Sequence, residues 1–222
     1  MIVDYDDYAK TFAHSRQNLR WPELCYFLSQ ISQDDIVVDI ACWSWRLIDA
    51  FRDYFKLSPN HYIGIDASKK LLLEARKNYP WYPFLVWNME DEHVYTSIYT
   101  SSWDKKKSLF CIAWFHHISN IKQRIITLRH WYNLLSAWER VYMTNWALES
   151  PVNKKRYINS MIQNSENEFW WHDFSIKIWK HNRWYHSFSL SELDYLAKEV
   201  GFTIIENCLF STEKNFITIL EK

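Results

Sequence analysis

Short apolar runs alternate along this chain with longer segments in which apolar residues recur every three or four positions. The runs are rich in β-branched and aromatic residues and predict buried strands at 36–40, 62–66, 84–86, 108–113 and 140–144. The helical spacing predicts helices at 46–55, 69–78, 121–135 and 189–200, and two closing strands follow at 202–207 and 216–220. This alternation predicts an α/β fold with a Rossmann-like, doubly wound and mainly parallel sheet.

Local signals mark several of the predicted helix ends. Pro22 suits the first turn of a helix, because its missing N–H has no partner there. Ser68 can cap the helix that follows it, and Ser189 with Glu192 three residues later forms a capping box. Gly201 then suits the C-terminal cap of that last helix.

The chain has 222 residues, which suits a single domain. Apolar positions at helical spacing predict an N-terminal helical lid over 1–30, so the α/β domain occupies 31–222. Within that domain, residues 150–182 are polar and lack a clear period, which predicts an irregular insertion.

Charge and cysteine content exclude several classes of protein. Lys plus Arg and Asp plus Glu both number 26, so a zero net charge gives no overall attraction to nucleic acid or membrane. The four cysteines are scattered without a CxxC pair, which predicts reduced thiols and no zinc site. The start of the chain is acidic and no long apolar run follows, so we expect a cytoplasmic protein with no membrane span and no metal.

Glycine and tryptophan contents are abnormal. The chain has 2 glycines and 14 tryptophans. A soluble domain of this length has about 15 glycines. The missing glycines are therefore about as many as the tryptophans.

Polar residues follow the predicted strands in chain order. Asp39 and Asp66 lie at the ends of two strands, Asn88 follows a third, and the pair His116 and His117 follows a fourth. The carboxyl ends of parallel strands share one edge of a sheet, so this order indicates a nucleotide-type ligand at that edge.

This series of elements resembles the class I S-adenosylmethionine-dependent methyltransferases over nearly the whole chain. The resemblance implies S-adenosylmethionine as the cofactor, held by a loop after the first strand, an acid after the second and a polar residue after the third. The implied cofactor-binding residues are Asp39, Ala41, Cys42, Trp43, Trp45, Asp66, Ala67, Asn88, Met89 and Ala113. Many members of the family have Asp in place of Asn88.

Four segments extend the resemblance to the methyltransferases that esterify carboxymethyl-uridine at the tRNA wobble position. These segments are YDDYAKTFAHSRQNLRWPEL, IAWFHHI, TNWALES and RWYHSFSLSELDYL, although Trp184 replaces a tyrosine that is usual in the family. The resemblance implies tRNA as a partner and a small adaptor subunit as another. The implied catalytic residues are His116, His117, Arg183, Tyr185 and His186.

Several tryptophans fall where this family has glycine, namely Trp43, Trp45, Trp87 and Trp138, with Trp114, Trp170, Trp171 and Trp179 as further candidates. An indole in the first loop would fill the space meant for the cofactor. One hypothesis is a decoding artefact, because UGA is read as Gly in some bacterial codes and as Trp in others. The competing hypothesis is a non-catalytic pseudoenzyme with genuine tryptophans.

The residues themselves leave further alternatives open. A carboxylate acceptor is already nucleophilic and needs no general base, whereas a hydroxyl or amine of a small molecule would make His117 a candidate base. The segment with Arg183, Tyr185 and His186 can equally serve to anchor the C-terminal helix. Arg16 and Trp21 suit packing of the lid better than contact with RNA.

Overall fold

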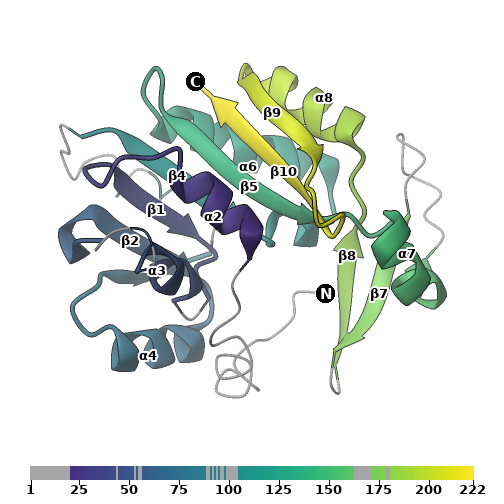
Figure 1. Ribbon diagram of the computed structural model, residues 1–222, viewed down its shortest axis with the longest axis horizontal. Helices are drawn as coiled ribbons and strands as arrows, with labels where there is room; N and C mark the ends of the chain where they lie inside the picture. Colours follow the sequence, from purple (N-terminus) through teal and green to yellow (C-terminus); the bar gives the residue numbers. More distant parts are fainter. Residues whose placement is uncertain are drawn as a thin grey trace.

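A seven-stranded sheet runs through the centre of the computed structural model (Figure 1). Its strand order is β3-β2-β1-β4-β5-β10-β9. The strands are β1 (Ile36–Ile40), β2 (Tyr62–Asp66), β3 (Phe84–Val86), β4 (Lys107–Ile112), β5 (Arg140–Trp146), β9 (Thr203–Leu209) and β10 (Asn215–Glu221). The first five run parallel, and β10 pairs antiparallel with both β5 and β9. The predicted mainly parallel α/β sheet is confirmed.

The structure describes residues 21–43, 45–52, 54, 57–88, 91, 93, 95, 98, 105–162, 172–178 and 181–222. Most of the expected N-terminal lid, including Arg16, lies outside these residues, as does Met89. Of the lid's expected helices, the structure describes only Pro22–Leu28.

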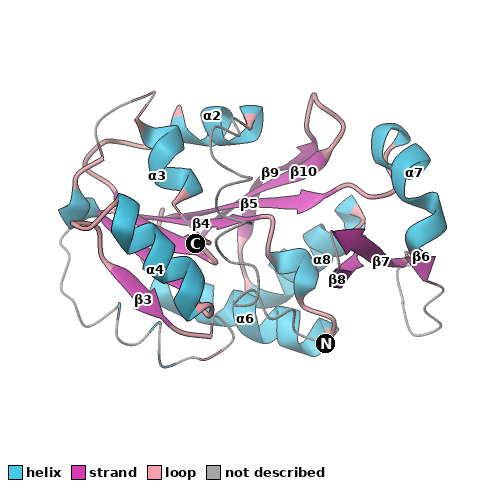
Figure 2. Cartoon of the chain, turned by 90° about the horizontal axis from the view of Figure 1, so that it is seen from below, coloured by secondary structure: helices cyan, strands magenta, loops and turns pink. Residues whose placement is uncertain are grey.

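Helices cover both faces of the sheet, as a doubly wound fold requires (Figure 2). The helices are α2 (Pro22–Leu28), α3 (Arg46–Phe51), α4 (Lys69–Asn78), α6 (Ile121–Leu134), α7 (Pro151–Tyr157) and α8 (Leu190–Val200). Short 3₁₀ turns lie at η2 (Pro59–His61), η3 (Phe115–His117) and η4 (Ile158–Ser160). One buried cluster lies between the sheet and α6 and α8, and the other lies beneath α2 and α3. None of the described helices is long and apolar enough to cross a membrane.

The predicted caps are confirmed. Ser68 Oγ accepts a hydrogen bond from Leu71 N at 3.1 Å, and Ser189 Oγ accepts one from Glu192 N at 2.9 Å. Gly201 ends α8 at φ 103°, a conformation that glycine adopts at no steric cost.

A second sheet lies beyond the carboxyl end of β5 (Figure 1). It consists of β6 (Met161–Ile162), β7 (Asp173–Ile178) and β8 (His181–His186), all paired antiparallel. We expected 150–182 to be irregular, but its described residues form α7, η4, β6 and β7. The apolar side chains of Phe174 and Ile176 are buried against Leu148 and Tyr185, which is what makes this polar segment a strand.

The chain reverses its direction of strand addition at β1. From β1 the sheet grows through β2 to β3 on one side, and then through β4 and β5 on the other. Ligands of open α/β sheets bind outside the carboxyl ends of the strands at such a switch point. The fold therefore predicts a ligand site at the residues that follow β1 and β4.

Candidate functional site

Main-chain hydrogen bonds bring the ends of the parallel strands together at one edge. Cys42 N, just after β1, donates to Ile65 O at 3.0 Å, and Trp87 N donates to Asp66 O at 2.9 Å. Ala113, just after β4, donates its N–H to Thr144 O at 3.1 Å. The segments assigned to the cofactor from the sequence therefore lie side by side.

Asp66 connects the loop after β1 to the N-terminus of α4. Its Oδ2 accepts the main-chain N–H of Trp43 at 2.9 Å, and its Oδ1 accepts that of Ser68 at 2.8 Å. The side chain is buried at the end of β2. It thus fixes the loop to the N-terminus of α4.

The loop after β1 has a left-handed backbone at three positions. The φ angles are 54° at Ala41, 57° at Trp43 and 130° at Trp45. Ala113, at the end of the neighbouring strand, has φ 55°. Side chains with a Cβ rarely adopt such angles, so the chain is strained on both sides of the switch point.

The indoles of this loop are almost completely buried. Trp43 is 8% exposed and Trp45 is 5% exposed. The Arg46 guanidinium lies 4.1 Å from the centre of the Trp43 ring and 4.2 Å from that of Trp21. The loop is therefore closed by a cation held between two aromatic rings.

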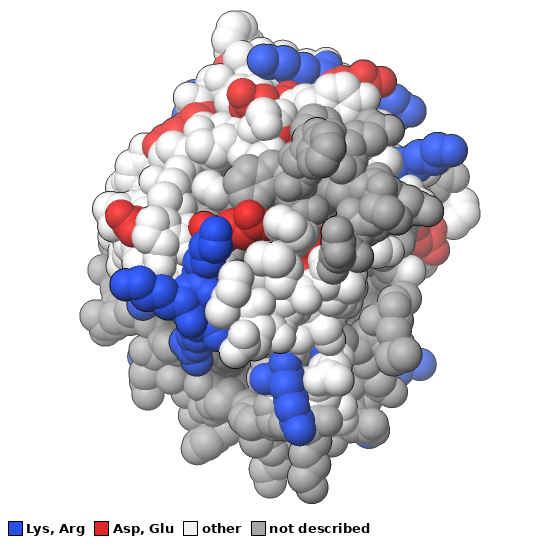
Figure 3. Space-filling view, turned by 90° about the vertical axis from the view of Figure 1, so that its right-hand side faces the viewer, with Lys and Arg blue, Asp and Glu red and all other residues white. Residues whose placement is uncertain are grey.

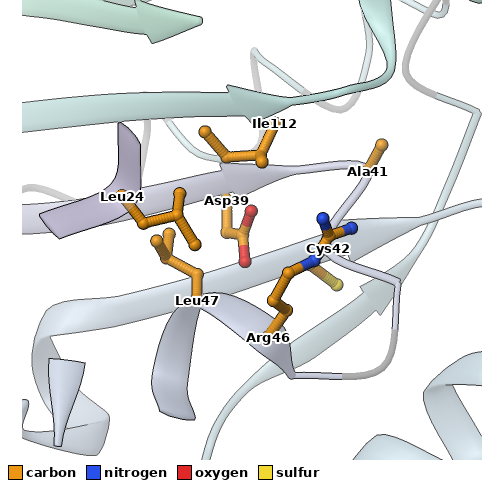
Figure 4. Close-up of a pocket in the computed structure, with 7 residues that line it drawn as sticks. All are labelled: Leu24, Asp39, Ala41, Cys42, Arg46, Leu47 and Ile112. Carbon is orange, nitrogen blue, oxygen red and sulfur yellow. The ribbon is translucent and has the colours of Figure 1, made fainter. Parts of the chain in front are cut away.

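A small cavity remains beneath the loop (Figure 4). Its volume is about 10 Å³, which holds about one water molecule. The residues that line it are Leu24, Asp39, Ala41, Cys42, Arg46, Leu47 and Ile112.

Asp39 lies within β1 and faces this cavity (Figure 4). Tyr62 Oη donates to its Oδ2 at 2.8 Å. Burial raises the pKa of Asp39 to about 7, although the Tyr62 hydrogen bond and the Arg46 charge oppose the shift. The carboxyl group therefore titrates near neutral pH.

The remaining predicted cofactor residues differ in exposure. Burial raises the pKa of the Cys42 thiol well above its usual range, so it stays protonated. Ala67 and Asn88 are exposed at the same edge. These positions fit the outer wall of a ligand site.

His116 and His117 lie in η3, directly after β4. His116 Nδ1 accepts the Trp146 N–H at 3.3 Å, so the ring proton of the neutral imidazole is on Nε2. Burial lowers the pKa of His116 well below its usual value, so the ring is neutral. Its Nε2 makes no hydrogen bond of good geometry within the described part of the chain, although the Asn145 side chain lies close enough to oppose part of the fall in the His116 pKa.

His117 has the opposite arrangement of its ring nitrogens. Its Nδ1 lies 3.0 Å from the Trp184 carbonyl oxygen and donates to it, which leaves a lone pair on Nε2. Burial, together with the nearby Arg183 charge, lowers the pKa of His117 to about 4. The pair thus offers one donor, His116 Nε2, and one acceptor, His117 Nε2.

Three aromatic side chains, which we term the aromatic wall, stand next to the histidine pair. The rings of Trp146 and Tyr185 stack at 4.9 Å and 12°, and Tyr157 stacks on Trp146 at 6.0 Å. His117 lies 4.6 Å from the Tyr185 ring. The sequence indicated Tyr185 but missed this role of Trp146, because the wall forms only when β8 folds back over the end of β5.

Asn145 is a further residue that sequence reasoning missed. Its side chain is fully buried beside His116 and opposes part of the fall in the His116 pKa, but neither amide atom makes a hydrogen bond of good geometry with a described residue. Buried polar atoms normally have well-formed hydrogen bonds, so this cluster has capacity left to bind a polar group.

His186 is held at both ring nitrogens. Nδ1 lies 2.8 Å from Asp173 Oδ1 and Nε2 lies 2.9 Å from Glu192 Oε2, while Arg124 donates to Glu192 Oε1 at 2.8 Å. All four side chains are buried. This network attaches β8 to α8, which matches the anchoring alternative for His186 and holds Arg183 and Tyr185 in place.

No metal-binding group is found within the described ranges, where no three His, Cys, Asp or Glu side chains could share an ion. The groups that the structure places at this edge are hydrogen-bonding side chains, the buried guanidinium of Arg183 on β8 and the aromatic wall.

Comparison with known sequences gives one short match. "Putative methyltransferase 235L" of Invertebrate iridescent virus 6 is 28% identical over 99 residues, which cover 41% of this chain. The match spans about a third of the viral protein, 35% of its length. No protein-family profile matches the chain.

Solved structures match over almost the whole chain. A Haloferax volcanii "putative methyltransferase", solved in complex with the Trm112 methyltransferase activator, is 14% identical with a TM-score of 0.67 and covers 100% of this chain and 99% of its own. CalS10 of Micromonospora echinaspora, an amino pentose methyltransferase solved with S-adenosylmethionine bound, is 11% identical with a TM-score of 0.64 over 100% and 99%. The chain therefore has the fold of the class I S-adenosylmethionine-dependent methyltransferases.

Within the part of the chain that the structure describes, the tryptophans of the loop leave too little room for that cofactor. A site for a ligand of nucleoside size has a volume of roughly 300 Å³ or more. The indoles of Trp43 and Trp45 are buried at the loop, and the cavity beneath it measures about 10 Å³. The chain thus combines the fold of these methyltransferases with a loop whose ligand space is filled by the indoles of Trp43 and Trp45.

Proposed function

We propose that this chain is an S-adenosylmethionine-dependent methyltransferase whose acceptor binds between η3, the end of β5 and β8. The observation that supports this most strongly is the group of buried polar atoms beside the aromatic wall, His116 Nε2 and the Asn145 amide. They lie at the carboxyl edge of the sheet, on the other side of the switch point from Asp66. The proposal requires a loop free of the indoles of Trp43 and Trp45.

We propose a carboxymethyl-type modified uridine at the wobble position of tRNA as the acceptor. An aromatic wall with polar atoms at its edge suits a planar base. Arg183 is buried on β8, close enough to His117 to lower its pKa, and a cation there suits a carboxylate. A carboxylate needs no general base, so these residues would serve to bind and orient it.

Contact with the rest of a tRNA would be local. The exposed side chains of Lys154, Lys155 and Arg156 lie in α7, next to the second sheet. On the face shown in Figure 3, Lys and Arg side chains form small separate groups with Asp and Glu between them. With a net charge of zero, we expect few phosphate contacts and a shallow dependence of binding on salt.

A small activator subunit is a further part of the proposal. The Haloferax volcanii neighbour was solved in complex with the Trm112 activator. An activator that binds beside the acceptor site would add RNA-binding surface to this chain of zero net charge.

A second candidate is a small-molecule methyltransferase with a hydroxyl or amine acceptor. The lone pair on His117 Nε2 favours it, because a neutral imidazole can accept the proton that such a group loses. A pKa of about 4 makes this ring a weak base at neutral pH, which is why the carboxylate acceptor is preferred. CalS10, which acts on an amino pentose, is a structural neighbour of this type.

The test uses the chain with glycine at positions 43 and 45, with and without a Trm112-type activator. It is incubated with labelled S-adenosylmethionine and tRNA that carries carboxymethyl-uridine, or with the same tRNA carrying plain uridine. We expect label in the modified tRNA alone. Label in plain tRNA, or only in hydroxyl or amine compounds, would refute the proposed acceptor.

Arg183 provides the matched variants. Arg183→Ala should lower kcat/KM on the modified tRNA by about 100-fold, which corresponds to about 2.7 kcal/mol of lost stabilisation, and Arg183→Lys should lose less. Thermal unfolding of both variants separates loss of binding from loss of fold. An equal loss of acceptor binding and of cofactor binding in Arg183→Ala would contradict the role given to Arg183.

A further inference from the structure

The tryptophans of this chain fall into two groups by their backbone. Trp43, Trp45 and Trp138 have φ angles of 57°, 130° and 70°. No other tryptophan among the described residues has a positive φ. The three positions are among the four at which the family resemblance of the sequence implies glycine, the fourth being Trp87.

A tryptophan at these angles is strained. A side chain with a Cβ costs roughly 1–2 kcal/mol in the left-handed region. Trp45 is the extreme case, because φ 130° with ψ 9° lies outside even the small left-handed region open to other residues. Glycine adopts all of these conformations without steric cost.

Trp138 shows that packing does not compensate for this strain. It lies in the turn before β5, where its N–H donates to Lys222 O at 2.8 Å, and its side chain is 74% exposed. An exposed indole gains little from burial, and this turn is remote from the switch point. The positive φ of Trp138 is therefore unrelated to any reaction at the candidate site.

Other tryptophans behave as indoles are expected to. Trp131 is fully buried, and its Nε1–H donates to Tyr95 Oη at 3.0 Å. Trp146 belongs to the aromatic wall. Neither residue has a positive φ, so at both positions the backbone conformation is one that a tryptophan adopts without strain.

The two written glycines complete the pattern. Gly201 has φ 103°, and a Cβ on Gly64 would lie 2.7 Å from the Phe84 ring and 2.9 Å from Cys42 Sγ. Both are positions where only glycine fits. The strained tryptophans occupy positions of the same kind.

We propose that positions 43, 45 and 138 are glycine in the functional protein, their codons being UGA read as glycine by its own translation machinery. The tryptophans in the sequence would then result from translating the gene with a genetic code in which UGA means tryptophan. Trp87 and Trp114 are not included, because their backbones do not require glycine. With glycine at 43 and 45, the loop has no side chain at these two positions. The space that the indoles occupy at the switch point then opens for a ligand.

The test reads the three codons in the gene and the masses of the peptides that contain them, using protein isolated from its own source. We expect UGA at 43, 45 and 138, and peptide masses lower by the difference between tryptophan and glycine. The controls are the codons of Trp131 and Trp146, which should be UGG.

A UGG codon or a tryptophan mass at any of the three positions overturns the proposal. UGA at 131 and 146 also overturns it, because the same codon would then stand where an indole is needed. The inference and the proposed function can fail separately: tryptophan at 138 alone overturns the inference and leaves the proposed function intact, whereas glycine at all three positions with no methyl transfer to the modified tRNA does the reverse.

Discussion

The main-chain N–H of Trp43 donates to Asp66 Oδ2 across 2.9 Å, joining the loop after β1 to the acid that ends β2. The same carboxylate accepts the Ser68 N–H through its other oxygen. A carboxylate that accepts two buried or half-buried N–H groups holds both segments in register. The shape of the candidate cofactor loop therefore depends on Asp66.

Replacing Asp66 should loosen this loop. Asp66→Ala removes the acceptor of two N–H groups, and we expect a loss of about 2–4 kcal/mol in the free energy of unfolding, measured in urea. Asp66→Asn keeps one acceptor oxygen and should lose about half as much. Amide hydrogen exchange should become faster at Trp43 in the alanine variant, and unchanged exchange there would refute the proposed role.

Asp39 should make stability depend on pH. Burial raises its pKa to about 7, above the value of about 3.9 in an unfolded chain. The stability from its protonated form is fully present below pH 4 and is lost as the pH rises to about 7. Asp39→Asn has no ionisable group at this position, so its stability should not fall in this way. The stability of the variant minus that of the parent should therefore be about 2–4 kcal/mol larger at pH 8 than at pH 4.

Tyr62→Phe serves as the matched variant. It removes a hydrogen bond that favours ionised Asp39, so the loss of stability between pH 4 and 8 should become larger. Identical pH profiles for the parent and Asp39→Asn would show that Asp39 is not desolvated.

Trp138 tests the cost of the left-handed backbone by itself. Glycine at 138 should be more stable than alanine by about 1 kcal/mol in urea unfolding, because φ 70° strains any residue with a Cβ. At exposed Trp81, which lacks a positive φ, alanine should instead be the more stable. If the glycine variant is the more stable of the two at both positions, or the alanine variant at both, the proposed backbone strain at 138 is contradicted.

The histidine pair can be examined by NMR of ¹⁵N-labelled protein. We expect His117 to be neutral, with its proton on Nδ1, down to a pH of about 4, because it is buried and donates to Trp184 O. His117→Gln retains a polar side chain and serves to assign the signal. A ring that becomes protonated near pH 6.5 would exclude the buried arrangement described for His117.

Much of the fold followed from periodicity. The strands at 36–40, 62–66 and 84–86 were predicted with their observed bounds, because buried parallel strands appear as short apolar runs. The second sheet was missed although β7 alternates polar and apolar residues, which is the pattern of a half-buried strand. The polar composition of 150–182 as a whole obscured this short run, and its pairing with β8 is a tertiary contact.

The site was predictable in the same uneven way. Asp66 and Ala113 could be placed because strand ends meet at one edge. Asn145 and Trp146 could not, since their role depends on β8 lying against η3. The contacts of His186 were equally hidden, because Asp173 and Glu192 meet it from different elements.

The most direct measurement is calorimetry of S-adenosylmethionine binding to two purified proteins of verified mass, the written chain and its Trp43→Gly/Trp45→Gly variant. A Trp87→Gly protein controls for loss of an indole at a position with an ordinary backbone. The account predicts binding by the double-glycine protein at least about 100-fold tighter than by the written chain, or about 2.7 kcal/mol. Tight binding by the written chain, or no binding by the double variant, would contradict it.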